Sequence, residues 1–140
     1  GLGDVYKRQF KWDEQKGTLE EFERVPVPPD SFSGKSYTAE IIAHPSGKFL
    51  YVSNRGHDSI SVLSIDPHSG RLVVVDHTPT QGNYTRNFNL DPTGNWLIAL
   101  NRESNTVVIF AIDPQTGILT PTGQVLDVLN PSCVRWVPLG

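Results

Sequence analysis

The chain repeats itself at a constant offset of 47 residues, and this repeat restricts the possible folds more than any other feature. Three segments recur without a gap. The segment His44-Pro45-Ser46-Gly47 recurs as Asp91-Pro92-Thr93-Gly94, and Asn54-Arg55 recurs as Asn101-Arg102. The segment Asp66-Pro67-His68-Ser69-Gly70 recurs as Asp113-Pro114-Gln115-Thr116-Gly117. A fixed period of this length indicates a repeat architecture in which each unit packs on its neighbours.

Each repeat contains short runs of β-branched and aromatic residues, separated by turns that contain Pro and Gly. The predicted strands are residues 40–43, 49–53, 59–65 and 71–76 in the first repeat, and 96–100, 106–112 and 118–125 in the second. The alternation within residues 59–65 suits a half-buried strand. Four antiparallel strands in about 45 residues, with no helical periodicity, match the size of one β-propeller blade. The predicted fold class is therefore all-β.

The repeat continues in both directions, so the chain contains parts of two further blades. Residues 10–19 match the end of a blade, followed by a six-residue insertion around Pro28-Pro29. We therefore divide the chain into the end of a blade (10–36), two whole blades (37–83 and 84–129) and the first strand of another blade (130–140). Because a propeller needs roughly four to eight blades to close its ring, the chain is predicted to be a partial ring from a larger protein.

Residues 1–9 fit no strand of the repeat. Residues 4–9 read Asp-Val-Tyr-Lys-Arg-Gln, which resembles the translation of a transposon end used to tag sequencing libraries. We interpret residues 1–9 as a non-native scar and leave them out of the fold prediction. Native sequence would then begin near Phe10, in the middle of a blade. The alternative interpretation is an ordinary disordered N-terminus.

The charge and composition of the chain exclude several classes of function. The formal net charge is −3 at pH 7, which argues against a nucleic-acid surface. No apolar run approaches the length needed to cross a membrane. With Cys133 as the single cysteine, no intrachain disulfide can form and no cysteine-based metal site is visible. We expect no metal, cofactor, nucleic acid or membrane as partner. We also expect a cytoplasmic location, and whether a signal peptide precedes the native sequence stays an open question.

The topology of a blade separates scaffold residues from candidate functional residues. The turns between the first and second strands, and between the third and fourth, lie on one face of the disc. The loops between the second and third strands, and the crossings between blades, lie on the other face. Turns that both repeats share are predicted scaffold, because Pro and Gly supply the backbone angles that turns require. His44 belongs to this group, since its equivalent is the turn residue Asp91.

The face with the blade crossings carries polar residues that differ between the two repeats. The unequal pairs are Glu40 with Asn87, Arg86 with Ala39, and His57 with Ser104. A carboxylate, a guanidinium and an imidazole on one rim could supply a general base, an anion clamp and a proton shuttle. Ordinary variation of solvent-exposed charges is the competing interpretation.

Two questions about these candidates stay open at the level of sequence. Arg55 recurs as Arg102, which favours a scaffold role, although one of the two could face the channel. Glu40 and Arg86 are separated by 46 residues, one fewer than the repeat. Strict alternation would send these two side chains to opposite sides of their strands. Either a β-bulge intervenes or the two side chains do not share a pocket.

Five segments resemble a known family. They are residues 37–42 (Tyr-Thr-Ala-Glu-Ile-Ile), 44–55 (His-Pro-Ser-Gly-Lys-Phe-Leu-Tyr-Val-Ser-Asn-Arg), 59–62 (Ser-Ile-Ser-Val), 85–94 (Thr-Arg-Asn-Phe-Asn-Leu-Asp-Pro-Thr-Gly) and 130–134 (Asn-Pro-Ser-Cys-Val). Together they are similar to the lactonase-family seven-bladed propellers, whose best-known activity is 6-phosphogluconolactonase. The similarity extends from Phe10 to the C-terminus.

The resemblance implies a metal-independent hydrolase that opens a sugar lactone, in the first place 6-phosphogluconolactone to 6-phosphogluconate in the pentose phosphate pathway. Members of the family place a carboxylate and arginines on the rim of the channel. Glu40 and Arg86 fall in the matching motifs and are the predicted catalytic residues, with His57 as a third, and Arg55 is the predicted substrate-binding residue. The expected partner is a small-molecule sugar lactone, and the expected full-length protein is a monomer.

Other functions fit the same residues. The carboxymuconate cyclases share the propeller and act on a different acid, and a catalytically silent propeller would serve as a binding scaffold. Trp12-Asp13 resembles the signature dipeptide of WD40 repeats, but the equivalent positions hold Ile65-Asp66 and Ile112-Asp113. The absence of a Gly-x-Ser-x-Gly motif argues against a serine-nucleophile esterase.

Overall fold

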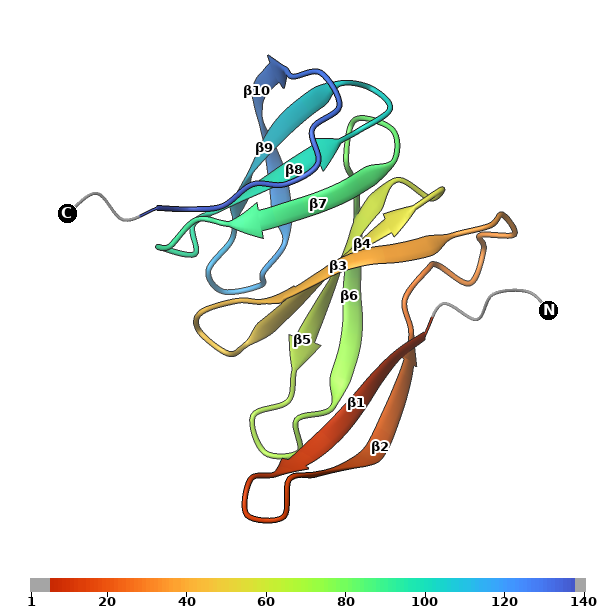
Figure 1. Cartoon of the computed structure of the whole chain (residues 1–140), viewed down its shortest axis with the longest axis vertical. Coiled ribbons are helices and arrows are strands. Elements are labelled where there is room, and N and C mark those ends of the chain that lie inside the picture. Colours follow the sequence, from red (N-terminus) through yellow and green to blue (C-terminus); the bar gives the residue numbers. More distant parts are fainter. Residues whose placement is uncertain (1–5, 138–140) are drawn as a thin grey trace.

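The computed structural model describes residues 6–137, which form ten β-strands and no helix. The strands are β1 (Tyr6–Asp13), β2 (Thr18–Pro26), β3 (Tyr37–Ala43), β4 (Phe49–Arg55), β5 (Ser59–Ile65), β6 (Leu72–Pro79), β7 (Thr85–Leu90), β8 (Trp96–Asn101), β9 (Thr106–Ile112) and β10 (Leu119–Asp127). Within each sheet every strand pairs antiparallel with the next strand along the chain. The result is one two-stranded sheet, β1-β2, and two four-stranded sheets, β3-β4-β5-β6 and β7-β8-β9-β10 (Figure 1). The predicted all-β fold class is confirmed.

The two four-stranded sheets are copies of one blade at the predicted offset. The second strands β4 and β8 begin at Phe49 and Trp96, which are 47 residues apart. The third strands and the fourth strands begin at the same spacing. The three sheets follow one another in space without closing into a ring within the described residues (Figure 1). This arrangement is that of a partial propeller.

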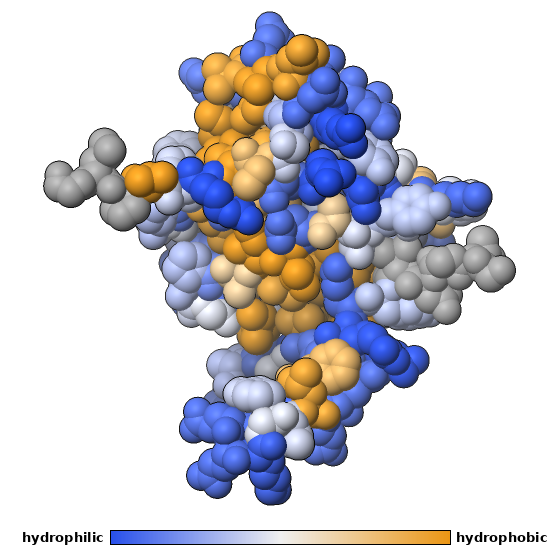
Figure 2. All heavy atoms as spheres, viewed as in Figure 1, coloured by the Kyte–Doolittle hydropathy of each residue, from blue (hydrophilic) through white to orange (hydrophobic). Residues whose placement is uncertain are grey.

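Two hydrophobic clusters join the sheets, one on each face of the sheet β3 to β6. On one face Tyr51 packs with Phe88 and Phe110 of the following sheet, and on the other Val52 packs with Val25 of the preceding one. Neighbouring residues of β4 reach opposite clusters because successive side chains in a strand point to opposite faces. Figure 2 shows hydrophobic residues gathered over the two four-stranded sheets and bordered by hydrophilic ones. Each blade is therefore stabilised mainly by its neighbours.

Gly70 and Gly117 occupy equivalent turns, but their surroundings differ. Both have φ in the left-handed region, at +71° and +74°. A Cβ atom at Gly117 would lie 2.6 Å from the ring of the buried Phe49, whereas a Cβ atom at Gly70 would meet nothing within 4 Å. The two positions thus share the same backbone strain on substitution and differ in the room for a side chain.

We expect Gly117→Ala to destabilise the protein more than Gly70→Ala. Alanine in the left-handed region costs roughly 1–2 kcal/mol at either position. The clash with Phe49 should add about 1–3 kcal/mol at Gly117, as overpacking in a core does. Urea unfolding of both variants measures the difference, with Gly70→Ala as the control for backbone strain. Equal unfolding midpoints would show that Phe49 does not pack on this turn.

Residues 6–9 belong to β1, so the prediction that residues 1–9 fit no strand is wrong for this segment. Pairing begins at Tyr6, opposite Pro26, and continues through the rest of β1. Antiparallel pairing uses backbone N–H and C=O groups, which nearly every residue type supplies. The side-chain pattern therefore could not reveal it. Residues 1–5 lie outside the described residues, and the non-native origin of the segment stays a prediction.

The segment after β10 runs beside β7 and forms no strand within residues 128–137. Val134 is attached there through both of its backbone polar groups. Its N–H donates to Oδ1 of Asn87 at 3.2 Å, and its carbonyl oxygen accepts from Nδ2 of Asn89 at 3.2 Å. The strand predicted here would pair with the second strand of its own blade, which this sequence does not contain. Residues 138–140 lie outside the described residues.

Candidate active site

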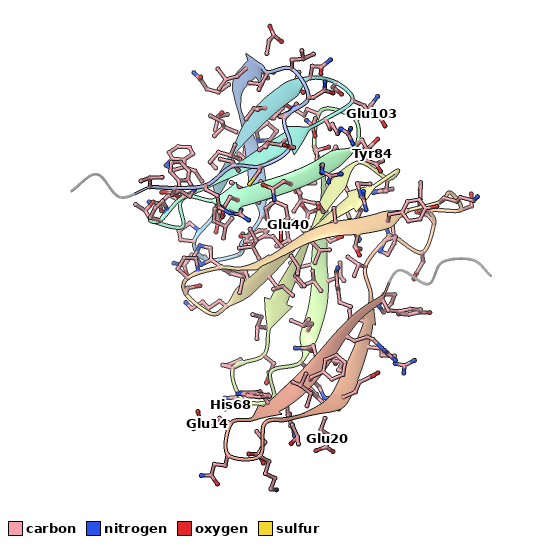
Figure 3. The ribbon with its side chains drawn as sticks, viewed as in Figure 1. Glu14, Glu20, Glu40, His68, Tyr84 and Glu103 are labelled. Atoms are coloured by element: carbon pink, nitrogen blue, oxygen red, sulfur yellow. The ribbon has the colours of Figure 1, made fainter. Side chains whose placement is uncertain are left out.

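The four predicted site residues come from two neighbouring blades. Glu40 lies in β3 and Arg86 in β7, the first strands of their blades, which lie against each other. Figure 3 shows Glu40 between these two strands. Arg55 ends β4, and His57 lies in the loop that follows. Because Arg55 pairs with Tyr37 at the start of β3, Arg55 and His57 lie at the opposite end of the sheet from the turn that joins β3 to β4.

A β-bulge interrupts β3 and β7 at equivalent positions. In β3, the two residues Ala39 and Glu40 correspond to the single residue Ser53 of β4. In β7, the pairing skips Arg86, which is the equivalent of Ala39. A bulge re-aims side chains and breaks the alternation of faces. Strict alternation therefore no longer assigns Glu40 and Arg86 to opposite sides. A pocket shared by these two side chains stays a prediction.

Glu40 reaches from β3 to β7 and is held by three hydrogen bonds. Its Oε2 accepts from Nδ2 of Asn87 at 2.7 Å, and its Oε1 accepts from the backbone N–H of Ile41 at 3.3 Å. Its own backbone N–H donates to Oγ of Ser53 at 3.0 Å. The residue is half-buried. The carboxylate is thus fixed in position while solvent can still reach it.

Arg55 and Arg86 differ in how firmly they are held. Arg55 donates to the hydroxyl of Tyr84 at 3.0 Å, and its guanidinium lies 5.0 Å from the centre of the Tyr84 ring, within the range of a cation–π interaction. Its Nε is buried and has no partner among the described residues. Arg86 is exposed and forms no ion pair within residues 6–137. Arg55 is therefore positioned across the blade boundary, whereas Arg86 can meet an anion from solvent.

Tyr84, which holds Arg55, has an uncommon backbone conformation. Its φ is +59°, a value that aromatic residues rarely adopt. Its N–H donates to Oδ1 of Asp58 at 2.9 Å. Strained residues of this kind cluster at functional sites, where the surrounding structure holds them in place. Tyr84 was not among the residues selected from the sequence, although the repeat contains a signal. Its equivalent is Tyr37 in the preceding blade and Pro131 in the following one.

His57 is not brought to the two predicted catalytic partners. Its Nδ1 lies 2.7 Å from Oγ of Ser59, and its ring lies edge-on to Phe32 at 4.8 Å and to His77 at 6.2 Å. Burial lowers the pKa of His57, and the nearby His77 lowers it further. Phe32 belongs to the insertion between β2 and β3. The contacts of His57 therefore attach this insertion to the blade, which is a structural role.

His44 has the scaffold role that the repeat predicts for it. Its Nε2 lies 2.8 Å from the carbonyl oxygen of Gly94 and donates to it, and its Nδ1 lies 2.8 Å from Oγ of Ser46. Gly94 belongs to the equivalent turn of the next blade. His44 thus joins the turns of two blades on the face away from Arg55.

Lys7 is a positive charge near Glu40 that the sequence analysis did not consider. Burial lowers the pKa of Lys7, and the negative charge of Glu40 opposes this effect. Lys7 lies in the segment predicted to be non-native, and it is given no role in the site.

The described part of the chain offers no cluster for a metal ion. Within residues 6–137, no group of three or more His, Cys, Asp or Glu side chains is arranged to bind one. The same residues contain no helix long and apolar enough to span a membrane.

Comparison with protein families decides which kind of propeller this is. A family model described as "Lactonase, 7-bladed beta-propeller" matches residues 7–136. The chain belongs to this lactonase family. The resemblance inferred from the sequence is thereby confirmed, and so is the assignment to a seven-bladed type of propeller.

Individual proteins and solved structures match large parts of the chain. A 6-phosphogluconolactonase of Bacillus subtilis (strain 168) is 37% identical over 77 residues, which is 55% of this chain and 22% of the relative. The structure of a periplasmic gluconolactonase from Pseudomonas aeruginosa matches with a TM-score of 0.90 and 30% identity, covering 98% of this chain and 38% of that one. A protein from Lactobacillus plantarum matches with a TM-score of 0.85 and 29% identity, over 92% and 37% of the two chains. The lactonase-family chain thus spans between 22% and 38% of the length of these relatives.

Proposed function

We propose that the full-length protein containing this chain hydrolyses a sugar lactone, and that 6-phosphogluconolactone is its substrate. The observation that carries the proposal is the carboxylate of Glu40, held between two blades by Asn87. Arg86 of the neighbouring strand β7 and Arg55 at the end of β4 are the proposed cationic groups. The names of the relatives support the substrate class. One is a 6-phosphogluconolactonase and another a gluconolactonase.

Hydrolysis of a lactone adds water to the carbonyl carbon and breaks the ring C–O bond. In the proposal, Glu40 takes a proton from the attacking water as general base. The guanidinium of Arg86 stabilises the negative charge that develops on the carbonyl oxygen. The proton on Glu40 then passes to the ring oxygen as it leaves, which returns Glu40 to its starting state.

Arg55 is the proposed binding group for the phosphate of the substrate. A guanidinium can pair with a phosphate through two parallel hydrogen bonds, and the contact with Tyr84 holds Arg55 in place for this purpose. His57 receives no step, because its contacts attach it to the insertion. Further groups of the site would come from blades that this chain does not include.

The test is a hydrolysis assay of the full-length protein on lactones with and without a phosphate group, corrected for the uncatalysed reaction. We expect faster turnover of the phosphorylated lactone. We also expect Arg55→Ala to raise KM for that substrate about 10-fold or more, as the loss of a charge-assisted hydrogen bond does. Arg102→Ala, the equivalent change in the next blade, is the matched control and should preserve the preference.

Two outcomes would change the proposal. Equal rates for both kinds of lactone would keep the lactonase activity and remove the phosphorylated substrate. A folded protein that hydrolyses no lactone above the uncatalysed rate would contradict the proposal and favour a catalytically silent propeller that serves as a binding scaffold.

A further inference from the structure

Three residues at the same position of successive blades are connected by hydrogen bonds. Glu40, Asn87 and Val134 are separated by 47 residues each. Nδ2 of Asn87 donates to Oε2 of Glu40 at 2.7 Å, and Oδ1 of Asn87 accepts from the backbone N–H of Val134 at 3.2 Å. Both donors point toward Glu40. The carboxylate is thus the final acceptor of a series that starts in the next blade.

The orientation of the Asn87 amide is determined by its two partners. Asn87 is 6% exposed, and buried polar groups need hydrogen-bond partners at both ends. The backbone N–H of Val134 can only donate, so it must meet the amide oxygen. The NH2 group of Asn87 therefore faces Glu40, and the carboxylate oxygen is the acceptor.

The contact between Asn87 and Glu40 differs in chemistry from the equivalent contact one blade further on. An amide donor meets a carboxylate in the first contact, whereas a backbone N–H meets the amide oxygen in the second. The position carries a carboxylate, an amide and a valine in three successive blades. Asn89, two residues further along β7, also binds the segment of Val134, through the carbonyl oxygen at 3.2 Å. Asn89 and Asn87 therefore both attach the segment of Val134 to β7, but of these two residues only Asn87 also binds Glu40.

We propose that Asn87 is the positioning residue of Glu40. It binds Oε2, so that the carboxylate keeps one orientation from which Oε1 meets the attacking water. Asn87 itself touches no reacting atom. This inference rests on the proposed function, since it takes Glu40 as the general base.

The test compares Asn87→Asp with Asn89→Asp in the full-length protein. Aspartate at position 87 keeps the shape of the side chain and the acceptor for Val134, but it replaces the donor to Glu40 by a like charge. We expect kcat for lactone hydrolysis to fall about 100-fold with KM changed less than about twofold, because a small misplacement of a catalytic group costs this much. Asn89→Asp adds the same charge to the same strand, and both constants should stay within about twofold of the wild type.

A second variant and a second kind of measurement test the positioning role of Asn87 further. They separate it from the effect of an added charge and from changes in turnover. Asn87→Ala removes the donor without adding charge, and we expect it to lower kcat as well. Crystal structures of the full-length wild type and Asn87→Asp report the orientation of Glu40 directly, and we expect the carboxylate to turn away from residue 87 in the variant.

The outcomes separate this inference from the proposed function. Wild-type kcat in both Asn87 variants, combined with a loss of kcat in Glu40→Gln, would overturn the positioning role and leave the lactonase proposal standing. If the wild type hydrolyses no lactone, the proposed function fails and the crystal structures decide the positioning role. An unchanged Glu40 in the Asn87→Asp structure would then overturn it.

Discussion

Replacing Glu40 by Gln in the full-length protein is expected to lower kcat for lactone hydrolysis by about 100- to 10,000-fold, the usual contribution of a general base. Glutamine has nearly the size of glutamate, and its amide oxygen can still accept the hydrogen bond from Asn87. It cannot take a proton from water. KM should therefore change little, since the substrate-binding contacts remain. Steady-state kinetics on the phosphorylated lactone measures both constants.

Glu103→Gln is the matched control for this substitution. Glu103 is exposed in the loop between β8 and β9, near Tyr84 on the face of the blade crossings (Figure 3). The change removes the same charge from this face without touching the contacts of Glu40. Both kinetic constants should stay close to those of the wild type. Normal turnover by a correctly folded Glu40→Gln protein would remove Glu40 from the mechanism.

The 140-residue chain expressed by itself is expected to lack lactonase activity, with a rate at least about 1,000-fold below that of the full-length protein. It contains Glu40, Arg55 and Arg86, but the proposed site also draws on other blades of the ring. Removing members of a cooperating site commonly costs several orders of magnitude in rate. The same assay on the isolated chain and on the full-length protein gives the ratio.

The isolated chain is also expected to associate. The sheet β1-β2 has only half of the strands of a blade, and unpaired strand edges are templates for pairing with other chains. Apolar side chains near both ends of the described range are exposed, with Trp12 at 62% and Leu129 at 80%. In a closed ring neighbouring blades cover such faces. Light scattering should therefore give a mass above the 15.5 kDa of one chain.

Leu129→Lys provides a check on the cause of this association. It places a charge on an exposed apolar position after β10, so it should reduce the mass in solution without changing the folded sheets. An isolated chain that is a monomer, unfolds cooperatively and matches the full-length rate would contradict both the partial-ring fold and the proposed mechanism.

The repeat was sufficient to predict the blades because it fixes the turns. Pro92-Thr93-Gly94 lies where Pro45-Ser46-Gly47 predicts it, and the strands on either side follow at the same spacing. The two ends of the chain were harder to predict. Residues 6–9 pair through their backbone with β2, which no side-chain pattern records. Residues 130–137 match the repeat, yet a first strand forms only when the second strand of its blade is present.

The comparison of repeats could select candidate site residues but not their contacts. It singled out Glu40 as unequal to Asn87, but the hydrogen bond between them depends on how far a side chain reaches across a blade boundary. His57 was selected in the same way, as unequal to Ser104. Its actual partner, Phe32, comes from an insertion that has no counterpart in the repeat, so the repeat could not indicate it. The β-bulge at Arg86 was one of two stated alternatives, and only the strand pairing revealed it.

The most direct test of the proposed site is a crystal structure of the full-length protein with 6-phosphogluconate, the product of the proposed reaction. We expect the carboxylate of the product to lie within hydrogen-bond distance of Glu40 or Arg86, and its phosphate to pair with Arg55. Binding at the face of Pro45 and Pro92, or anywhere that leaves Glu40 without contact to the product, would contradict it.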